Sequence, residues 1–321
     1  MLKIKHLASK MAIFFHLIIF VFACYFAWSH YVENIKDANI KVENRLTLES
    51  NIKKELLDKF YITASTEIVF WAENGSLKLG LDTLKTTWSE LGNSVSKQLR
   101  KVYIDDNPFK NKEEFVVSKN GTNYDILHQA MHEFLYDLQK TRGYADIYLL
   151  DLNGNVLYSV KKKRAFAQNI SKAQNNLSEV FNECKASDKK EFVSFRDFKK
   201  EDSSFLATSV SDEDGEKIGV LVFEFSKDSI TKITPLNQIN KEECKTRFEK
   251  KSEYFTAFTC TKFKDNYWGI KTSKKIEEIY KPIKEEFFDE LVIYISIAIF
   301  SLSLSYLILE KLLGRKEEDD E

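Results

Sequence analysis

The chain has 321 residues, and its 48 basic and 49 acidic side chains leave a formal net charge of −1 at pH 7. This balance, together with the lack of a basic stripe interleaved with aromatic residues, excludes nucleic acid as an expected partner. Hydrophobic residues make up 43% of the chain and only three prolines interrupt it, so a sizeable folded core is expected.

Two uncharged apolar runs, residues 11–28 and 291–309, lie near the two ends of the chain. Each is long enough for a helix to cross the roughly 30 Å of hydrocarbon in a bilayer. Basic residues flank both runs toward the chain ends: Lys3, Lys5, Lys10, Lys311, Arg315 and Lys316. Because cytoplasmic flanks carry the excess of Lys and Arg, we predict a two-pass protein of the bacterial inner membrane. Both termini are then cytoplasmic, the main domain is periplasmic, and the lipid bilayer is a partner.

The first apolar run could instead be a cleaved signal sequence. Residues 29–33 offer no small-x-small cleavage site, and the large Phe22 fits badly in the lipoprotein-like box at 21–24. An uncleaved anchor is therefore predicted. Only twelve residues follow the second run, so any signalling output is expected to come from another membrane protein.

The four cysteines leave an odd number outside the membrane, because Cys24 lies within the first apolar run. Of the other three, Cys244 and Cys260 flank a short segment that could return as a hairpin. A disulfide between them would stabilise the fold by about 3 kcal/mol. Unpaired thiols are the alternative.

Apolar positions recur at helical spacing from residue 35 to residue 57, which predicts a long amphipathic helix that continues the first run. Gly75, Gly80 and Gly92 mark turns, so this half of the domain is expected to contain three or four helices.

The β pattern starts near residue 145. Residues 145–150 and 155–160 are rich in β-forming residues and are joined by a turn with Asn153 and Gly154, which predicts a hairpin. Residues 171–184 predict a crossing helix, and residues 191–198, 204–210 and 217–225 predict three more strands. The expected fold is therefore α+β with a five-stranded antiparallel sheet.

The last part of the predicted domain is shorter. Residues 241–251 predict a helix, and residues 254–263 and 267–272 predict a second pair of strands. A final helix is expected to begin near Ser273 and to be kinked by Pro282.

These patterns divide the chain into seven predicted segments. They are a cytoplasmic N-terminus at 1–10, a transmembrane helix at 11–29, a helical module at 30–140, a sheet module at 141–232, a reduced membrane-proximal module with the exit helix at 233–288, a second transmembrane helix at 289–309 and a cytoplasmic tail at 310–321.

Residues 144–160 resemble the Cache-type extracellular sensor domains of bacterial chemoreceptors and sensor kinases, which are PAS-like modules. The resemblance covers about residues 95–230 and includes Tyr124, His128, His132, Asn169, the Phe195-Arg196-Asp197-Phe198 and Phe205-Leu206-Ala207-Thr208 segments, and the Ile218–Val222 strand. Three departures are the short charged loop at 199–202, the segment 233–254, which is too short for a complete second sheet module, and the end of the chain at Glu321, where similar receptors continue into a linker module and a signalling or catalytic domain.

The resemblance implies a PAS-like antiparallel sheet, a small-molecule ligand, and a homodimer whose entry helices pack together. It implies a role in signal transduction or chemotaxis through a membrane signalling partner. The alternatives are a structural or truncated receptor remnant without a ligand and a cell-envelope enzyme.

Six residues are predicted to bind the ligand: Tyr148, Arg164, Phe195, Arg196, Asp197 and Phe205. Asp197 lies in a predicted strand, where a charge needs a partner. Arg196 and Arg164 could supply that partner or bind an anionic ligand, and a solvated position is the alternative for both. Phe192, Phe223 and Phe225 could line the pocket with Phe195 and Phe205, although their alternating spacing favours the core.

The other motifs in the sequence do not predict a functional site. His128 and His132 are four residues apart on a predicted helix, but two ligands do not make a metal site, so packing against the sheet is expected. The basic run 161–164 follows the hairpin and is expected to be a solvated loop. No nucleophile elbow or phosphate-binding glycine loop occurs, so neither enzymatic activity nor a cofactor is expected.

Overall fold

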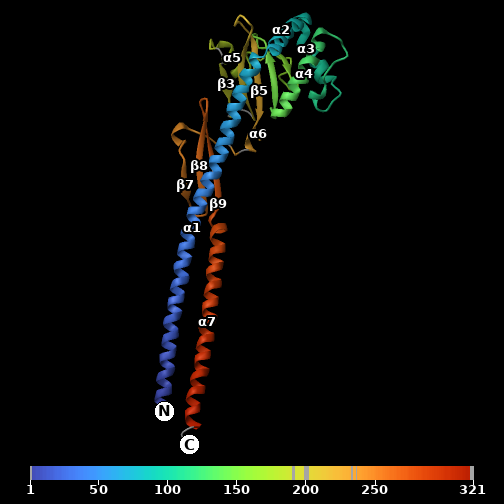
Figure 1. Cartoon of the computed structure of the whole chain (residues 1–321). Helices are drawn as coiled ribbons and strands as arrows, with labels where there is room; N and C mark the ends of the chain where they lie inside the picture. Colours follow the sequence, from blue (N-terminus) through green and yellow to red (C-terminus); the bar gives the residue numbers. More distant parts are fainter. Residues whose placement is uncertain (1, 190–191, 199–201, 233, 236, 319–321) are drawn as a thin grey trace. The chain divides into compact units, whose positions relative to one another are not determined.

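The structure is a computed structural model that describes residues 2–189, 192–198, 202–232, 234–235 and 237–318. It divides into two compact units. The sheet unit contains Ile52–Lys245 and Cys260–Ile270, and the terminal unit contains Met1–Asn51, Thr246–Thr259 and Lys271–Glu321. Helix α1 (Leu2–Glu73) begins in the terminal unit and ends in the sheet unit (Figure 1).

The sheet unit is built on a five-stranded antiparallel sheet with the strand order β2-β1-β5-β4-β3. Its strands are β1 (Asp146–Leu150), β2 (Val156–Ser159), β3 (Val193–Arg196), β4 (Ser203–Ser211) and β5 (Lys217–Ser226). The five strands and their antiparallel pairing confirm the α+β fold predicted from the sequence. The order places β5 at the centre, so its side chains are buried on both faces of the sheet.

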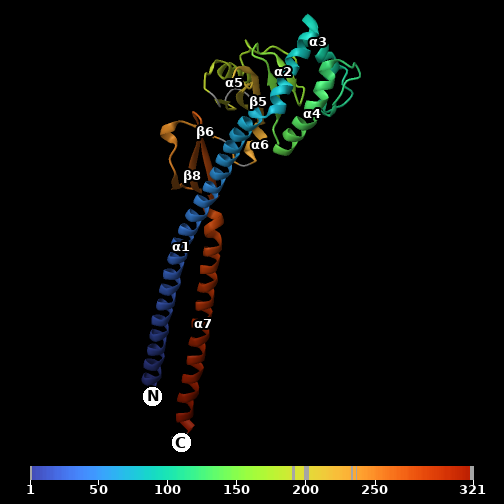
Figure 2. The ribbon, with the colours of Figure 1, turned by 45° about the horizontal axis from the view of Figure 1, so that its top comes forward.

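Helices cover one face of this sheet: the end of α1, α2 (Gly75–Glu90), α3 (Val95–Arg100) and α4 (Asn123–Arg142) (Figure 2). The buried residues of α1 recur every three or four positions, so one stripe of the helix packs into the core: Leu57, Tyr61, Ala64, Ile68 and Ala72. Thr122 and Asp125 form a capping box at the start of α4. Gly143, with φ 71°, ends that helix in the left-handed conformation.

Short helical turns connect these elements: a 3₁₀ turn at Gly92–Ser94, a π-helical turn at Lys101–Asp105 and a 3₁₀ turn at Lys112–Glu114. After the sheet, α6 (Lys227–Thr231) follows β5 directly.

Helix α5 (Asn176–Ala186) covers the opposite face of the sheet. Between them lies an apolar core made by Tyr148, Leu150, Val156, Leu177, Val180, Phe181, Phe205, Ala207, Val220 and Val222. The helix begins five residues after its predicted start at Ser171. Asn175 caps it by accepting the Ser178 amide, whereas Ser171 bonds to the Asn169 side chain in the preceding turn.

A second sheet has the strand order β6-β9-β8-β7, with β6 at Asn237–Ile239, β7 at Arg247–Lys250, β8 at Tyr254–Phe263 and β9 at Asn266–Lys275. The helix predicted for residues 241–251 is wrong. A 3₁₀ turn at Lys241–Glu243 is followed by β7, which pairs with β8. A disulfide joins Cys244 to Cys260, whose Cα atoms are 5.4 Å apart, and fixes the chain just before β7.

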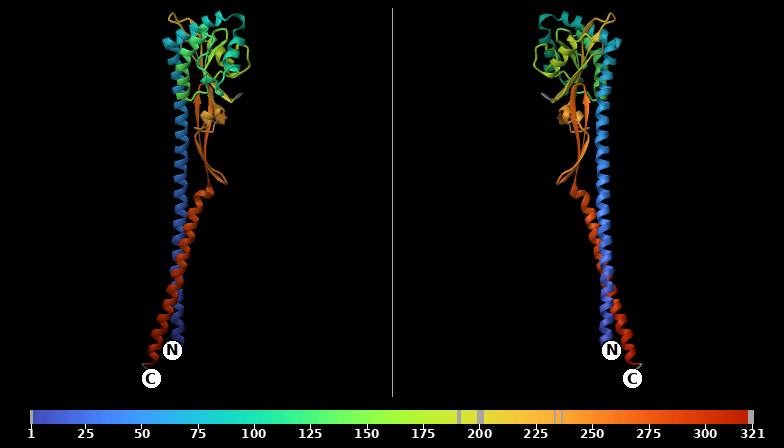
Figure 3. Two further views of the ribbon diagram at one scale, coloured as in Figure 1. Left: turned by 90° about the vertical axis from the view of Figure 1, so that its right-hand side faces the viewer. Right: turned by 90° about the vertical axis from the view of Figure 1, so that its left-hand side faces the viewer.

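In the terminal unit, the first part of α1 runs beside α7 (Ile276–Glu318) (Figure 3). His30 Nδ1 lies 3.2 Å from Glu290, and the Tyr31 and Phe287 ring centroids are 4.8 Å apart. Helix α7 starts at Ile276 and not near Ser273, because β9 continues to Lys275. Pro282 lies within α7, and the kink predicted there stays a prediction.

Two helical segments are long and apolar enough to cross a membrane by length and composition, Lys10–Glu73 and Ile276–Ile308. Their most apolar windows have mean hydropathies of 2.2 and 2.3, and at most 6% of either window is buried. Both windows therefore present apolar side chains outward along the described part of each helix.

Candidate ligand site

Four side chains form one row across the five-stranded sheet, because their strands are paired in register: Asp146 with Glu224, Glu224 with Phe205, and Phe205 with Arg196. Residues directly opposite in antiparallel strands point to the same face. Neighbouring strands are about 4.8 Å apart, so the row spans roughly 15 Å. Tyr148 lies on this same face, which is the face that α5 covers. The structure thus brings together three of the six predicted residues.

The acidic end of the row is centred on Glu224, which is 4% exposed. Its carboxylate accepts hydrogen bonds from Tyr148 Oη at 2.6 Å and from Ser203 Oγ at 2.6 Å. It also forms an ion pair at 3.0 Å with Lys163, whose side chain remains 45% exposed. Glu224 was missed in the sequence, although it is the single charge in the apolar run from Ile218 to Phe225.

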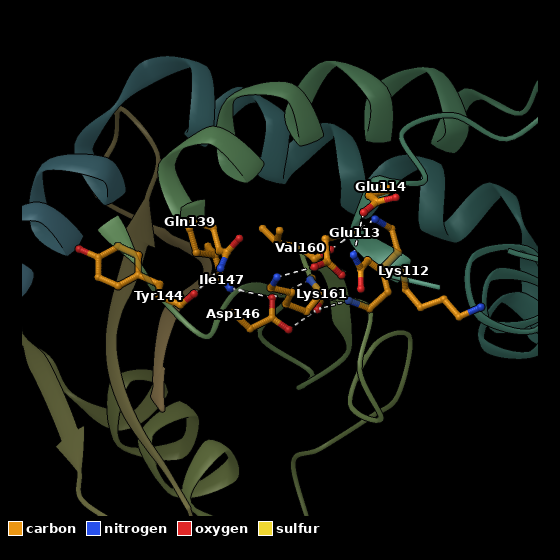
Figure 4. A network of polar contacts seen from close by, with 12 residues as sticks. Lys112, Glu113, Glu114, Gln139, Tyr144, Asp146, Ile147, Val160 and Lys161 are labelled. Carbon is orange, nitrogen blue, oxygen red and sulfur yellow. Dashed lines mark hydrogen bonds and ion pairs between the residues drawn. The ribbon is translucent and has the colours of Figure 1, made fainter. Parts of the chain in front are cut away.

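Asp146 is a second carboxylate beside Glu224 and has no exposed surface. It accepts hydrogen bonds from the amides of Ile147 and Lys161, at 2.8 and 3.0 Å (Figure 4). It also accepts a hydrogen bond from Ser159 Oγ at 2.8 Å. Burial, followed by the negative charge of Glu224, raises the pKa of Asp146 to about 6. The row therefore ends in two adjacent buried acids.

Replacing Asp146 with asparagine should stabilise the protein near neutral pH. The pKa of this carboxyl is raised from 3.8 to about 6 in the folded state. Between these two pH values the unfolded state has lost the proton while the folded state still binds it, so the free energy of unfolding falls as the pH rises. The asparagine amide can still accept from both backbone amides and can donate to Ser159. We expect a gain of about 1–3 kcal/mol at pH 7 and almost none at pH 4 in urea unfolding. Equal effects at both pH values, or the same gain from Asp188→Asn at an exposed position, would contradict this.

The other end of the row borders a cavity of about 400 Å³, within the size range of small-molecule sites. It lies beside the edge strand β3 and is lined by α5, by β3 and by the β8–β9 turn: Asn176, Glu179, Glu183, Phe192, Val193, Ser194, Phe195, Arg196, Asp197, Lys264, Asp265 and Asn266. Three predicted ligand residues are among these. The cavity is rich in charges of both signs.

The arginine at this edge is held by α5. Arg196 Nε lies 2.8 Å from Glu179, and its second terminal nitrogen pairs with Glu183. Asp197 accepts a hydrogen bond from Gln238 Nε2 at 2.7 Å, and its carbonyl accepts from Asn176. The partner that a charge at Asp197 was expected to need is thus supplied in part by β6.

Two more of the predicted residues lie outside the row. Phe195 lines the cavity beside β3, but its ring packs on the sheet face covered by α1–α4, against Tyr61, Phe263 and Trp268, with centroids 5.1 to 5.9 Å away. Phe223 and Phe225 also belong to that core, as their alternation predicted. Arg164 is exposed, and its carbonyl accepts a hydrogen bond from Arg100 at 2.9 Å. Arg164 is therefore not gathered with the others.

His128 and His132 lie in the core between α4 and the sheet, with stacked rings whose centroids are 5.0 Å apart. His132 accepts from Tyr158 Oη and bonds to the Glu113 carbonyl, and His128 Nδ1 bonds to the Val116 carbonyl. Burial lowers the pKa of His132 to about 4. The packing role predicted for both histidines agrees with these contacts. Among the residues that the structure describes, no group of three or more His, Cys, Asp or Glu side chains is placed to hold a metal ion.

The expectation of a fully solvated loop at 161–164 is wrong for Lys162, which is 2% exposed. Its amide donates to Ser159 Oγ at 3.0 Å, and Ser159 in turn bonds to Asp146. The backbone at Lys162 adopts a positive φ of 50°, and this turn directs the Lys162 side chain into the protein. Burial lowers the pKa of the Lys162 ammonium to about 7, although Asp146 and Glu113 act in the opposite direction.

No protein-family model matches the sequence, and no curated protein matches it significantly. The chain is similar to the solved extracellular domain of a protein described as a histidine kinase, with 11% identity, a TM-score of 0.45 and coverage of 81% of this chain and 99% of the other. It is similar to the periplasmic sensory domain of the Campylobacter jejuni chemoreceptor Tlp1, with 13% identity, a TM-score of 0.36 and coverage of 76% and 99%. It is also similar to the ligand-binding domain of the Campylobacter jejuni chemoreceptor Tlp3 in complex with 4-methylisoleucine, with 15% identity, a TM-score of 0.32 and coverage of 70% and 95%. These are domains of a kinase and of two chemoreceptors, the classes of protein that the sequence resemblance names.

Proposed function

We propose that this protein is a membrane-anchored extracytoplasmic sensor that binds a small molecule on the α5 face of its five-stranded sheet. Helix α1 and helix α7 would each cross the inner membrane, with the sheet unit in the periplasm and basic flanks in the cytoplasm. In this topology the disulfide between Cys244 and Cys260 lies in an oxidising compartment, where such bonds persist.

The observation that carries the proposal is the row from Asp146 and Glu224 past Phe205 to Arg196. Glu224 is a buried carboxylate whose hydrogen bonds from Tyr148 and Ser203 fix its orientation. Lys163 neutralises it, but nearly half of the Lys163 side chain is in contact with solvent. A ligand ammonium group can therefore replace the Lys163 ammonium at Glu224 without leaving a buried charge unpaired.

The rest of the row sets the expected ligand class. Phe205 lies next to Glu224 in the core beneath α5 and is 5% exposed, so the apolar body of a ligand at Glu224 would pack against this ring. Arg196 is already paired with Glu179 and Glu183, so a free carboxylate on the ligand gains less there than an ammonium gains at Glu224. We therefore propose a small primary amine or amino acid as the ligand, which reaches Glu224 from the exposed side of Lys163.

The test is a thermal-shift and calorimetry screen of the full chain in detergent against amines, amino acids and simple carboxylates. Amines or amino acids should raise the thermal midpoint, because a ligand that binds only the folded state stabilises it. Glu224→Gln should weaken binding by about 10-fold to 100-fold, since it removes a charge-assisted bond of about 1.5–3 kcal/mol. Glu213→Gln, at an exposed position in the β4–β5 turn, is the matched control and should bind normally.

A screen in which no compound raises the thermal midpoint would contradict the proposed function. The same conclusion follows if Glu224→Gln keeps its unliganded midpoint and binds the ligand as tightly as the unaltered protein. A preference for simple carboxylates over amines would place the ligand at Arg196 and contradict the proposed class.

A structural domain without a ligand is the second candidate. It is favoured by the apolar half of the α5 face, where Leu150, Val180 and Val222 are completely buried. A catalytic role gains less support, since His128 and His132 have no exposed surface through which a substrate could reach them.

A further inference from the structure

Three consecutive lysines, Lys161–Lys163, follow β2 and extend their side chains to three different places in the sheet unit. The ammonium group of the first lysine pairs with Glu113 (Figure 4). The ammonium group of the third pairs with Glu224 at 3.0 Å in the proposed site. The middle lysine has its side chain in the core and is 2% exposed. We call these three residues the lysine strap.

The two ends of the lysine strap are fixed by hydrogen bonds to the backbone. The Val160 amide donates to the Ile147 carbonyl in β1 at 3.2 Å. On the other side, Arg100 donates to the carbonyls of Arg164 and Phe166 at 2.9 and 2.8 Å. The three lysines lie between these anchors, so a movement of the backbone at one of them carries the other two with it.

The lysine strap covers the carboxylate of the proposed site. Glu224 is 4% exposed, whereas the Lys163 side chain that pairs with it is 45% exposed. A ligand that replaces Lys163 therefore arrives from the side of the strap. Because so little of Glu224 is exposed, room for the body of the ligand on this side has to come from a movement of the strap.

Lys162 determines how firmly the strap is held. Within the described part of the chain its ammonium group has one hydrogen bond, to the Val160 carbonyl at 3.4 Å, although an ammonium group can donate three. Burial lowers the pKa of Lys162 from 10.5 to about 7, and the attraction of Asp146 and Glu113 does not offset this effect. The closed strap therefore favours the neutral amine, whereas a released strap leaves the lysine in water, where it is an ammonium ion.

Charged and titratable groups of the neighbouring elements surround Lys162: Glu113 of the 3₁₀ turn, His128 and His132 of α4, Asp146 of β1, Tyr158 of β2, Glu224 of β5 and the strap residues Lys161 and Lys163. Burial lowers the pKa of both histidines below 6.5 and raises the pKa of Tyr158 above its usual range. The pKa of Asp146 is about 6, and the hydrogen bond from Lys161 outweighs burial and lowers the pKa of Glu113. Among these groups with a shifted pKa, Lys162 is the one that titrates between pH 7 and pH 9.

We infer that the lysine strap is a displaceable cover over Glu224, which opens when Lys162 leaves the core as an ammonium ion and takes Lys163 with it. The inference rests on the proposed function for the identity of the site, but the opening itself does not require a ligand. As the pH rises from 7 to 9, the closed state loses the proton of Lys162 while the open state keeps it, so the closed state becomes more stable. Below pH 7 both states bind this proton, and the charge of Lys162 has no further effect.

The test is hydrogen exchange, measured by mass spectrometry on the full chain in detergent without a ligand at pH 7, 8 and 9. In the closed strap the amides of Lys161 and Lys162 donate to Asp146 and Ser159, so these amides exchange when the strap opens. After correction for the intrinsic exchange rate at each pH, their exchange should fall about 5-fold to 10-fold per pH unit.

Two variants test the parts of the strap separately. In Lys162→Met the exchange should be slower and equal at the three pH values, because methionine is apolar and does not titrate. In Glu224→Gln the exchange should be about 3-fold to 10-fold faster at each pH, because Lys163 loses its charged partner. Lys172→Met is the matched control, since Lys172 is exposed outside the strap, and it should keep the pH dependence of the unaltered protein.

Exchange that does not fall with pH in the unaltered protein, or that falls equally in Lys162→Met, overturns the inference. An unchanged rate in Glu224→Gln overturns the link between the strap and the site.

A second measurement adds n-butylamine, which is an ammonium ion at pH 7 like the lysine side chain. It should raise the exchange of the strap amides as it replaces Lys163. An amine that raises the thermal midpoint but leaves this exchange unchanged overturns the inference and leaves the proposed function standing. If no amine raises the midpoint, the proposed function falls, and the pH dependence without a ligand decides whether the strap opens through Lys162.

Discussion

Replacing Gly219 with alanine should lower the thermal midpoint of the protein by about 5–10 °C. Gly219 lies in β5 at the centre of the sheet. A Cβ atom there would overlap the carbonyl oxygen of Leu150 in β1 and would come within 2.8 Å of Leu81 in α2. Neither neighbour can move freely, because the first belongs to the sheet backbone and the second is fully buried. Overpacking of this kind costs about 1–3 kcal/mol.

Gly75→Ala is the matched control. Gly75 is the first residue of helix α2 and does not have a positive φ. No atom lies within 4 Å of the position that a Cβ atom would take there. Its substitution should leave the midpoint unchanged or raise it slightly. Differential scanning fluorimetry of the two variants checks the prediction. Equal midpoints for both variants would contradict the prediction, because they would show that α2 and β1 can move enough to accommodate a Cβ atom at position 219.

Replacing Lys162 with methionine should stabilise the protein by an amount on the order of 3–5 kcal/mol at pH 7. The Lys162 ammonium is buried, and its pKa is lowered from 10.5 to about 7. Below pH 7 the folded protein bears the full cost of burying this charge. Between pH 7 and 10.5 the folded state loses the proton while the unfolded state keeps it, so that cost disappears. Methionine fills a similar volume without any charge.

The difference in unfolding free energy between the Lys162→Met variant and the unaltered protein should therefore fall toward zero as the pH rises from 7 to about 10. Urea unfolding at pH 6, 7, 8.5 and 10 measures this difference. Lys161→Met is the control, because Lys161 is paired with Glu113 and its loss should destabilise the protein slightly. A gain for Lys162→Met that is the same at every pH would mean that the benefit comes from packing and not from the removed charge.

The local parts of the fold could be predicted from the sequence. The β1–β2 hairpin follows from an alternating pattern joined by a turn at Asn153 and Gly154, which depends only on neighbouring residues. The helix expected at 241–251 failed because the contacts that determine β7 are distant in the sequence. β7 pairs with β8, and Cys244 is bonded to Cys260.

The candidate site was predicted only in part for the same reason. Tyr148, Phe205 and Arg196 could be chosen from the strands that contain them, but their common face follows from the pairing of four strands. That register also places Glu224 beside Asp146, a contact between residues that are far apart in the chain. Lys162 was expected in solvent because nothing in its own segment indicates the buried Ser159 and Asp146 that hold it.

Because Lys163 forms an ion pair with Glu224, its ammonium group competes with any amine ligand for the proposed site. A tethered ammonium group has an effective concentration set by the length of its linker, and short flexible linkers give values near the millimolar range or above. Any free amine must exceed this internal concentration before it occupies Glu224. The detection threshold of such a sensor would then be fixed by the geometry of one lysine side chain and not by the strength of its contacts with the ligand alone.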